Sequence, residues 1–306
     1  MANRRSWNET LRSYLDKRLL WIFILGCSSG FPWVLIGSNM SGWLKDAGLS
    51  RAAIGYFGSV FAVYAINFLW APLIDRIRIP VLYKLLGQRR SWIILCQFLI
   101  LLTTLLIAGV DPAGDLMFTS MLALCIATAS ATQDIAIDAY RIDTFPRSAE
   151  MKLPQASAMA VIGWWTGYSL PGYLAFINAD SIGWNGVYYG MAVIVGVLMF
   201  LTLIIGEPQT RREELQGIAE DRYNDLFNSR IITWISVTVI EPFLDFFKRN
   251  GVQVALTLLL FVFLFKIGEA FLGRMSIIFY KEVGFSNEQI GHYSKLIGWW
   301  VTIFFT

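Results

Sequence analysis

The chain has 306 residues, of which 56% are hydrophobic and only 15% are charged, and its mean hydropathy is +0.55. A soluble domain carries about 25% charged residues, so this composition excludes a soluble globular protein, and the net charge of +3 indicates no nucleic-acid partner. A single histidine, His292, leaves little basis for histidine catalysis or a metal site, and we expect no cofactor. All three cysteines lie inside apolar segments, as is typical of small buried side chains rather than of disulfides.

The apolar residues form long blocks, each close to the ~20 residues that a helix needs to cross a bilayer. We place eight membrane helices at residues 19–40, 51–74, 92–110, 116–139, 155–177, 186–206, 252–273 and 287–306. This pattern predicts an all-α, polytopic membrane helical bundle.

The basic residues predict how the bundle is oriented. Most of the 25 Lys and Arg residues lie in the N-terminal arm or after the second, fourth and sixth segments. Cytoplasmic loops carry an excess of Lys and Arg, so we expect the N-terminus and these loops in the cytoplasm. The two carboxylates of helix four, Asp134 and Asp138, then lie in its cytoplasmic half.

A polar stretch divides the chain into three parts. Residues 1–206 form a predicted N-terminal six-helix bundle, and residues 207–251 a cytoplasmic loop. Within that loop, Ile231 to Ile240 is about half as long as a membrane span requires, which favours an amphipathic segment lying on the membrane surface. Residues 252–306 are the first two helices of a second, incomplete bundle.

An internal repeat supports this division. The turn Lys45-Asp46-Ala47-Gly48-Leu49-Ser50 recurs as Lys281-Glu282-Val283-Gly284-Phe285-Ser286. Parallel duplication of a six-helix unit is the organisation of major facilitator transporters. Under this repeat the chain ends inside its eighth helix, so we expect a truncated major facilitator fold with one complete half and the start of the second.

The helix at 116–139 carries the candidate proton-coupling residues. Gln133, Asp134, Asp138 and Arg141 share a stripe, because residues three, four and seven apart lie on one face. Ionised groups at membrane depth face a bundle interior or a water-filled path, and burial disfavours the charged form of a carboxylate. Asp134 lies one turn deeper than Asp138 and is the preferred coupling residue, whereas Asp138 is expected to pair with Arg141.

A second carboxylate site competes with this one. Glu269 lies in the seventh helix, three residues after Lys266 on the same face. It is an alternative proton-coupling residue, unless the two side chains form a purely structural pair that neutralises both charges. If Lys266 instead faces a cavity, it can bind a substrate carboxylate.

Charged residues around the second and third helices suggest a gate. An Asp-Arg pair ends helix two and a basic cluster precedes helix three, which resembles the cytoplasmic gating motif of the facilitator superfamily. Asp75 can pair with nearby arginines and hold one conformation closed, while topology alone would account for the arginines. The candidate gating residues are Asp75, Arg76, Arg89, Arg90 and Arg141.

Aromatic and amide side chains at membrane depth suggest a sugar-binding site, since sugars bind to aromatic faces and convergent hydrogen-bonding groups. Tryptophans near segment ends are typical of the interfacial belt, so only the deeper ones are retained. The candidate substrate-binding residues are Trp33, Tyr64, Asn67, Gln133, Trp164 and Lys266. The pattern of Gly26, Gly30 and Pro32 favours close helix packing and bending.

Four stretches together resemble the AmpG muropeptide permeases, a family of the major facilitator superfamily. They are Leu25-Gly26 with Ser29-Gly30-Phe31-Pro32, Phe68 to Arg76, Ala131 to Ala139, and Lys266 to Phe271. The resemblance implies a monomeric, proton-driven importer of anhydromuropeptides in the bacterial inner membrane, serving cell-wall recycling and β-lactamase induction.

Other functions stay open at this point. A carrier of CoA esters or other amphiphilic anions from the same superfamily is the main alternative. An intramembrane enzyme is disfavoured because the sequence has no Ser/His or metal-ligand constellation, so we expect a non-enzyme. A non-transporting sensor would need no proton coupling, and substitution of Asp134 would then be harmless.

Overall fold

A computed structural model describes residues 14, 16–145, 152–208 and 236–306 of the chain. These residues form helices and turns, with no strand among them. Six helices in this described part are long and apolar enough to cross a membrane. The all-α membrane bundle predicted from the sequence is therefore confirmed, and the chain is a multi-pass membrane protein.

The first two membrane segments are both interrupted helices. The first consists of α2 (Lys17–Trp33), the π-helix η1 (Val34–Asn39) and α3 (Met40–Asp46). The second comprises α4 (Arg51–Phe57), η2 (Gly58–Phe61), α5 (Ala62–Ile66), η3 (Asn67–Leu69) and α6 (Ala71–Arg76). The 3-10 turns of the second segment tighten its backbone and leave it irregular.

The next segments are longer. After the short α7 (Leu82–Leu86), the third and fourth membrane helices are α8 (Gln88–Ala108) and α9 (Leu116–Thr144). The predicted fifth and sixth helices form one element, α10 (Leu153–Ile204), which bends at Gly183 with a φ of 69°. Because glycine adopts positive φ at little cost, the chain turns back there through a single kink rather than an open loop.

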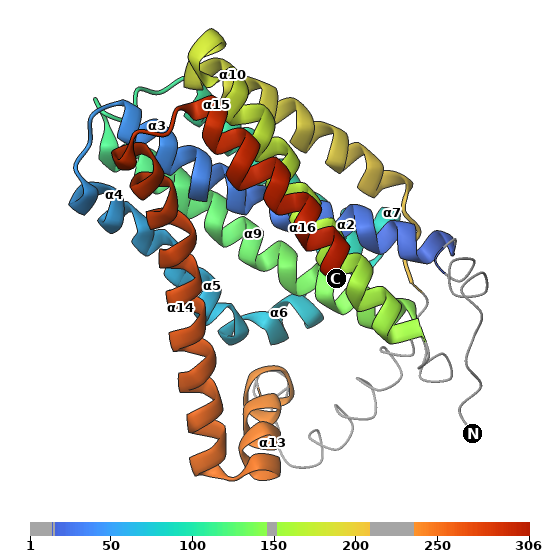
Figure 1. Cartoon of the computed structure of the whole chain (residues 1–306). Helices are drawn as coiled ribbons and strands as arrows, with labels where there is room; N and C mark the ends of the chain where they lie inside the picture. Colours follow the sequence, from blue (N-terminus) through green and yellow to red (C-terminus); the bar gives the residue numbers. More distant parts are fainter. Residues whose placement is uncertain (1–13, 15, 146–151, 209–235) are drawn as a thin grey trace, which may run out of the picture.

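The C-terminal part crosses the front of this bundle (Figure 1). It contains η5 (Ser236–Ile240), α13 (Glu241–Asn250), α14 (Val252–Val283), α15 (Asn287–Gln289), η6 (Ile290–Ile297) and α16 (Gly298–Phe305). Figure 1 shows α14 crossing beside α4 and α5, while η6 and α16 run along α10. Of the predicted interfacial segment, residues 231–235 lie outside the described residues, and the remainder forms η5.

Helices α2 and α10 pack closely enough to require glycine. A Cβ at Gly30 would overlap the backbone carbonyl of Trp164, and one at Gly167 would overlap the backbone of Cys27. A Cβ at Gly26 would lie 2.7 Å from the carbonyl oxygen of Ala160. Small residues allow helix backbones to approach one another in membranes, so the close packing expected at Gly26 and Gly30 is confirmed.

The two copies of the repeated turn contact each other. Lys45 of the first copy donates to Glu282 of the second at 2.9 Å, and Lys281 of the second pairs with Asp46 of the first. Each lysine thus pairs with the carboxylate that follows the other lysine, as expected of two copies related by a two-fold axis. We call these four residues the repeat clasp.

Candidate functional site

A cavity of about 410 Å³ lies between α2, α5, α9, α10 and α14. It brings together side chains from segments far apart in the sequence. The predicted residues that line it are Trp33, Tyr64, Asn67, Asp134, Asp138, Trp164 and Lys266. Ala65, Phe68, Val161, Trp165 and Val262 complete the lining and give part of it an apolar surface.

Asp134 lies at the deep end of the carboxylate stripe. Its Oδ1 accepts a hydrogen bond of 2.6 Å from the hydroxyl of Ser29 on α2. It also lines a second cavity of about 230 Å³, together with Ser29, Asp138 and Arg141. Asp134 is therefore on the wall that both cavities share.

Asp138 has a different environment. It forms an ion pair of 3.0 Å with Arg141, one turn further along α9, and its side chain is 65% exposed. This is the pairing expected from the i, i+3 spacing. Asp138 therefore has a basic partner on its own helix, whereas the hydrogen-bond partner of Asp134 is on another helix.

Five aromatic rings pack against one another, and three of them, Trp33, Tyr64 and Trp164, line the cavity. The Trp33 ring lies 4.6 Å from Tyr64, 4.9 Å from Phe61 and 5.8 Å from Trp164, centre to centre. Trp164 in turn stacks on Tyr168 at 5.4 Å. We call these five rings the aromatic wall.

Lys266 faces this wall from α14. Its Nζ lies 6.0 Å from the centre of the Trp33 ring, within the range of a cation–π contact. The cavity thus combines a cation, two carboxylates and flat aromatic faces, which can hold an amphiphilic, charged solute. Phe61 and Tyr168 were not predicted; they pack behind Trp33 and Trp164 and are not among the residues that line the cavity.

Two other predicted residues differ from this picture. Gln133 is fully buried, and its amide donates to the backbone carbonyl of Ser28 at 2.8 Å. Adjacent residues of a helix point about 100° apart, so Gln133 faces α2 while Asp134 faces the cavity. Glu269 lies within α14, but its side chain is outside the described residues, and its role stays a prediction.

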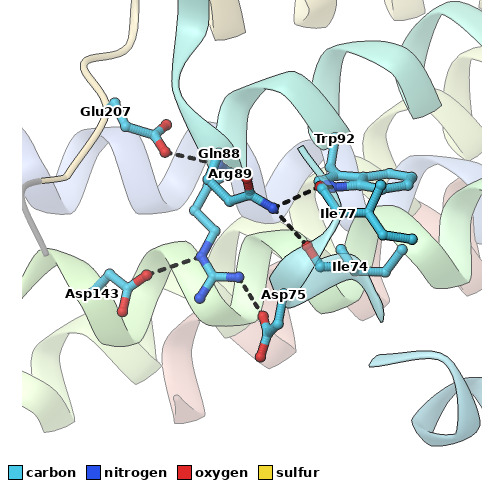
Figure 2. A network of polar contacts seen from close by, with 8 residues as sticks. All are labelled: Ile74, Asp75, Ile77, Gln88, Arg89, Trp92, Asp143 and Glu207. Atoms are coloured by element: carbon cyan, nitrogen blue, oxygen red, sulfur yellow. Dashed lines mark hydrogen bonds and ion pairs between the residues drawn. The ribbon is translucent and has the colours of Figure 1, made fainter. Parts of the chain in front are cut away.

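Figure 2 shows a polar network at the predicted cytoplasmic end of α8, centred on Arg89. The buried Arg89 guanidinium donates to Asp75 at 2.6 Å and to Asp143 at 2.9 Å. Gln88 donates from the same turn to the backbone carbonyls of Ile74 and Ile77, each at 2.9 Å. The beginning of α8 is thereby fixed to the end of the second membrane segment and to α9.

Glu207 holds the same helix end from the other side. Its two oxygens accept the backbone N–H groups of Arg89 at 2.7 Å and Arg90 at 3.1 Å. A carboxylate satisfies the free N–H groups and complements the dipole of a helix N-terminus. Burial raises the pKa of the Glu207 carboxyl, and these two donors oppose the rise. This contact, which joins α8 to the end of α10, was not predicted from the sequence.

The other candidate gating residues lie around this network. Arg90 donates to the backbone carbonyl of Thr202 at 3.3 Å, near the end of α10. Arg76 donates to the hydroxyl of Thr238 at 2.7 Å, which connects the second segment to η5. Arg141 belongs instead to the carboxylate stripe through Asp138.

Comparison with known proteins decides the family. The model of the Major Facilitator Superfamily matches residues 12–306. The chain belongs to the Major Facilitator Superfamily. The cavity and the polar network described above are therefore features of a Major Facilitator Superfamily chain.

Named relatives are similar over most of the chain. It is 36% identical to the putative transporter AmpG 4 of Rickettsia conorii, over 93% of this chain and 65% of the relative. It is 30% identical to the anhydromuropeptide permease of Escherichia coli K12, over 97% of this chain and 55% of the relative. The chain thus spans between about half and two thirds of the length of these relatives.

Proposed function

We propose that the chain is part of a proton-coupled importer of anhydromuropeptides in the bacterial inner membrane. The observation that carries this proposal is the cavity, in which Asp134 and Asp138 face an aromatic wall and a lysine. The similarity to an anhydromuropeptide permease supports the choice of substrate. Supply of muropeptides for cell-wall recycling and for β-lactamase induction belongs to the same proposal.

The substrate has groups that match the lining. GlcNAc joined to 1,6-anhydro-MurNAc offers two sugar rings, and its stem peptide offers carboxylates. In our proposal Trp33 and Trp164 contact the sugar faces, while Asn67 and the Tyr64 hydroxyl take part in hydrogen bonds. Lys266 attracts a carboxylate through a charge-assisted hydrogen bond.

Proton coupling is assigned to Asp134. Asp134 lines both cavities and accepts a hydrogen bond from Ser29. Protonation would remove the charge that this hydrogen bond stabilises, and the contact between α9 and α2 would weaken. Asp138 and Glu269 are the remaining candidates for the coupling carboxylate.

The Arg89 network is proposed as a cytoplasmic gate in a protein whose N-terminus is cytoplasmic. It connects the second, third and fourth membrane segments and the end of α10 within one cluster. Alternating access requires one half of a facilitator to move relative to the other around a midplane site. Rigid connections within the N-terminal half would make it move as one body.

The experiment is uptake into proteoliposomes that contain the full-length protein, with labelled GlcNAc-anhydro-MurNAc-tripeptide and an imposed pH gradient. We expect the protein to take up the labelled muropeptide. Unlabelled muropeptide should abolish this uptake by competition, and acetyl-CoA should leave it unchanged. Uptake of labelled acetyl-CoA, without uptake of the muropeptide, would support a CoA-ester carrier instead. Conversion of the muropeptide during the assay would contradict the expectation that the protein is not an enzyme.

A further inference from the structure

Two buried cations lie beyond the aromatic wall, outside the cavity described above. Lys295 of η6 is 1% exposed, and Arg274 of α14 is 5% exposed. Neither has a carboxylate within ion-pairing distance in the part of the chain that the structure describes. Removing an ion from water is costly, and buried charges in proteins are normally paired. Two such cations in one membrane bundle therefore point to a role beyond packing.

Among the described residues, the polar end of Lys295 contacts the N-terminal bundle. Its ammonium donates to the hydroxyl of Ser38 at 2.8 Å and lies 3.8 Å from the centre of the Tyr168 ring. Arg274 lies 4.6 Å from the centre of Phe61, and its Nε and Nη2 are buried without a hydrogen-bond partner. An aromatic face compensates an ion less than burial costs it. The charge of Arg274 is therefore not fully satisfied, and that of Lys295, which also interacts with the Tyr168 side chain, has no anionic partner among the described residues.

Glycine makes room for each of these side chains. A Cβ at Gly58 would overlap Nη1 of Arg274, and a Cβ at Gly172 would lie 3.1 Å from Cδ of Lys295. Gly58 lies in η2 and Gly172 in α10, so both belong to the N-terminal bundle. The second half thus places two cations in spaces that glycines of the first half leave open.

The two cations also occupy related positions in the repeat. Aligning the two copies of the repeated turn places Arg274 opposite Ser38, the residue to which Lys295 donates, and places Lys295 opposite Ser59, next to Gly58. The contact of Lys295 with η1 and that of Arg274 with η2 are therefore equivalent. Both lie on the surface that separates when the halves move.

The aromatic wall connects these cations to the cavity. Tyr168 stacks on Trp164, and Phe61 lies against Trp33. Arg274 follows Lys266 by eight residues on α14, which is roughly 12 Å along a helix. A solute that lies along the wall from Lys266 can therefore reach both cations when the interface on that side opens.

We propose that Lys295 and Arg274 form an anion subsite for the carboxylates of the transported substrate, reached from the face opposite the cavity. In the conformation described here the cations rest on Tyr168 and Phe61. When the halves separate on that face, they bind two carboxylates of an amphiphile whose rings lie along the aromatic wall. Two π-helical segments, η1 and η6, meet at this contact, and such segments are frequent at functional sites.

The test compares two probes on the full-length protein and rests on the proposed function. One probe is GlcNAc-anhydro-MurNAc-tripeptide, and the other is the same molecule with its peptide carboxylates amidated. The variants are Lys295→Met and Arg274→Gln, with the charge-retaining Lys295→Arg and Arg274→Lys beside them. Lys248→Met, on the exposed face of α13, is the matched control.

We expect the neutral variants to lower kcat/KM for the carboxylate probe on the order of ten- to a hundredfold. The amidated probe should change by less than about threefold, because it has no charge for these residues to bind. The charge-retaining variants should keep part of the preference for the carboxylate probe, and the control should keep all of it.

An equal loss for both probes would overturn the subsite, because a purely structural role affects every substrate alike. A preference for carboxylate that persists in both neutral variants would overturn it too. If correctly inserted wild-type protein took up neither probe, the proposed function would fail, and this inference with it.

Discussion

Asp134 and Asp138 are one helical turn apart on α9, yet their partners differ. Asp138 pairs with Arg141 on its own helix, whereas Asp134 accepts a hydrogen bond from Ser29 across the contact with α2. Only a group whose partner lies on another helix can convert protonation into a change between helices. This contrast is the residue-level reason to prefer Asp134 as the coupling group.

Trp33 is the central ring of the aromatic wall, so its removal should affect substrate binding directly. We expect Trp33→Ala to raise the KM for muropeptide uptake about tenfold or more, since stacking and cation–π contacts are both lost. Trp33→Phe should retain most of the affinity. Trp300→Ala is the control, because Trp300 is 54% exposed and lies on the outside of α16. Unchanged KM in Trp33→Ala would exclude this ring from the site.

Arg89 is the central residue of the polar network at the beginning of α8. Arg89→Gln would remove the guanidinium that donates to both Asp75 and Asp143. We expect it to lower the free energy of unfolding by about 2–3 kcal/mol, less than for a fully buried pair because the Asp75 side chain is 42% exposed. Thermal unfolding of the purified protein in detergent measures this, with Arg249→Gln, an exposed pair on α13, as control. Equal effects of the two substitutions would contradict the network's role.

The charged and aromatic residues of this site could be identified from the sequence. Which way each side chain points could not always be predicted. Asp134, Lys266 and Trp33 were expected and do line the cavity. Gln133 was expected beside them and faces α2 instead, because a one-residue difference on a helix turns a side chain by about 100°. Glu207 was missed, since its partners are backbone N–H groups brought close only by the packing of α8 against α10.

At the scale of elements, the contact between α2 and α10 sets the shape of the N-terminal bundle. Gly30→Ala would place a methyl group on the backbone carbonyl of Trp164. We expect it to lower the free energy of unfolding by roughly 1–3 kcal/mol or more, the usual cost of overpacking. A Cβ at Gly196, in α10, meets nothing within 4 Å, so Gly196→Ala should be neutral or stabilising. Fluorescence-detected thermal unfolding of the two variants would test the difference, and equal stability would contradict the close packing.

The membrane segments were predictable because runs of about 20 apolar residues are typical of membrane-spanning helices. The π-helical and 3-10 interruptions within these segments were not predictable from the sequence. The π-helical η1 packs against α10 and α14, and the 3-10 turn η2 packs against α14; local periodicity carries no information on such contacts. The fifth and sixth segments join in α10 because Gly183 turns the chain within a short polar stretch.

At the scale of the whole molecule, the repeat clasp joins the two copies of the repeated turn. Asp46 accepts from Lys281, from the Trp184 indole at 2.9 Å and from the Asn287 amide at 3.2 Å. Arg51 adds a second cation to Glu282, at 2.6 Å from Nε. The clasp thus connects the ends of the first and seventh segments to the kink of α10.

Charge reversal tests the clasp. Asp46→Lys should lower the free energy of unfolding by about 1–2 kcal/mol, a reduced figure because the Asp46 side chain is 35% exposed. The double variant Asp46→Lys with Lys281→Asp should recover part of that loss. Thermal unfolding of the wild type, both single variants and the double variant provides the coupling energy. Strictly additive effects would mean that the two side chains do not interact.

Coupling of proton movement to muropeptide transport by Asp134 is the central proposal for the whole protein. The measurement compares two modes of the same reconstituted full-length protein: accumulation driven by a pH gradient, and exchange of labelled for unlabelled muropeptide without a gradient. Asp245→Asn, an exposed carboxylate on α13, is the control. We expect Asp134→Asn to keep exchange but lose gradient-driven accumulation, while the control keeps both. Accumulation by Asp134→Asn at the wild-type level would contradict the proposal.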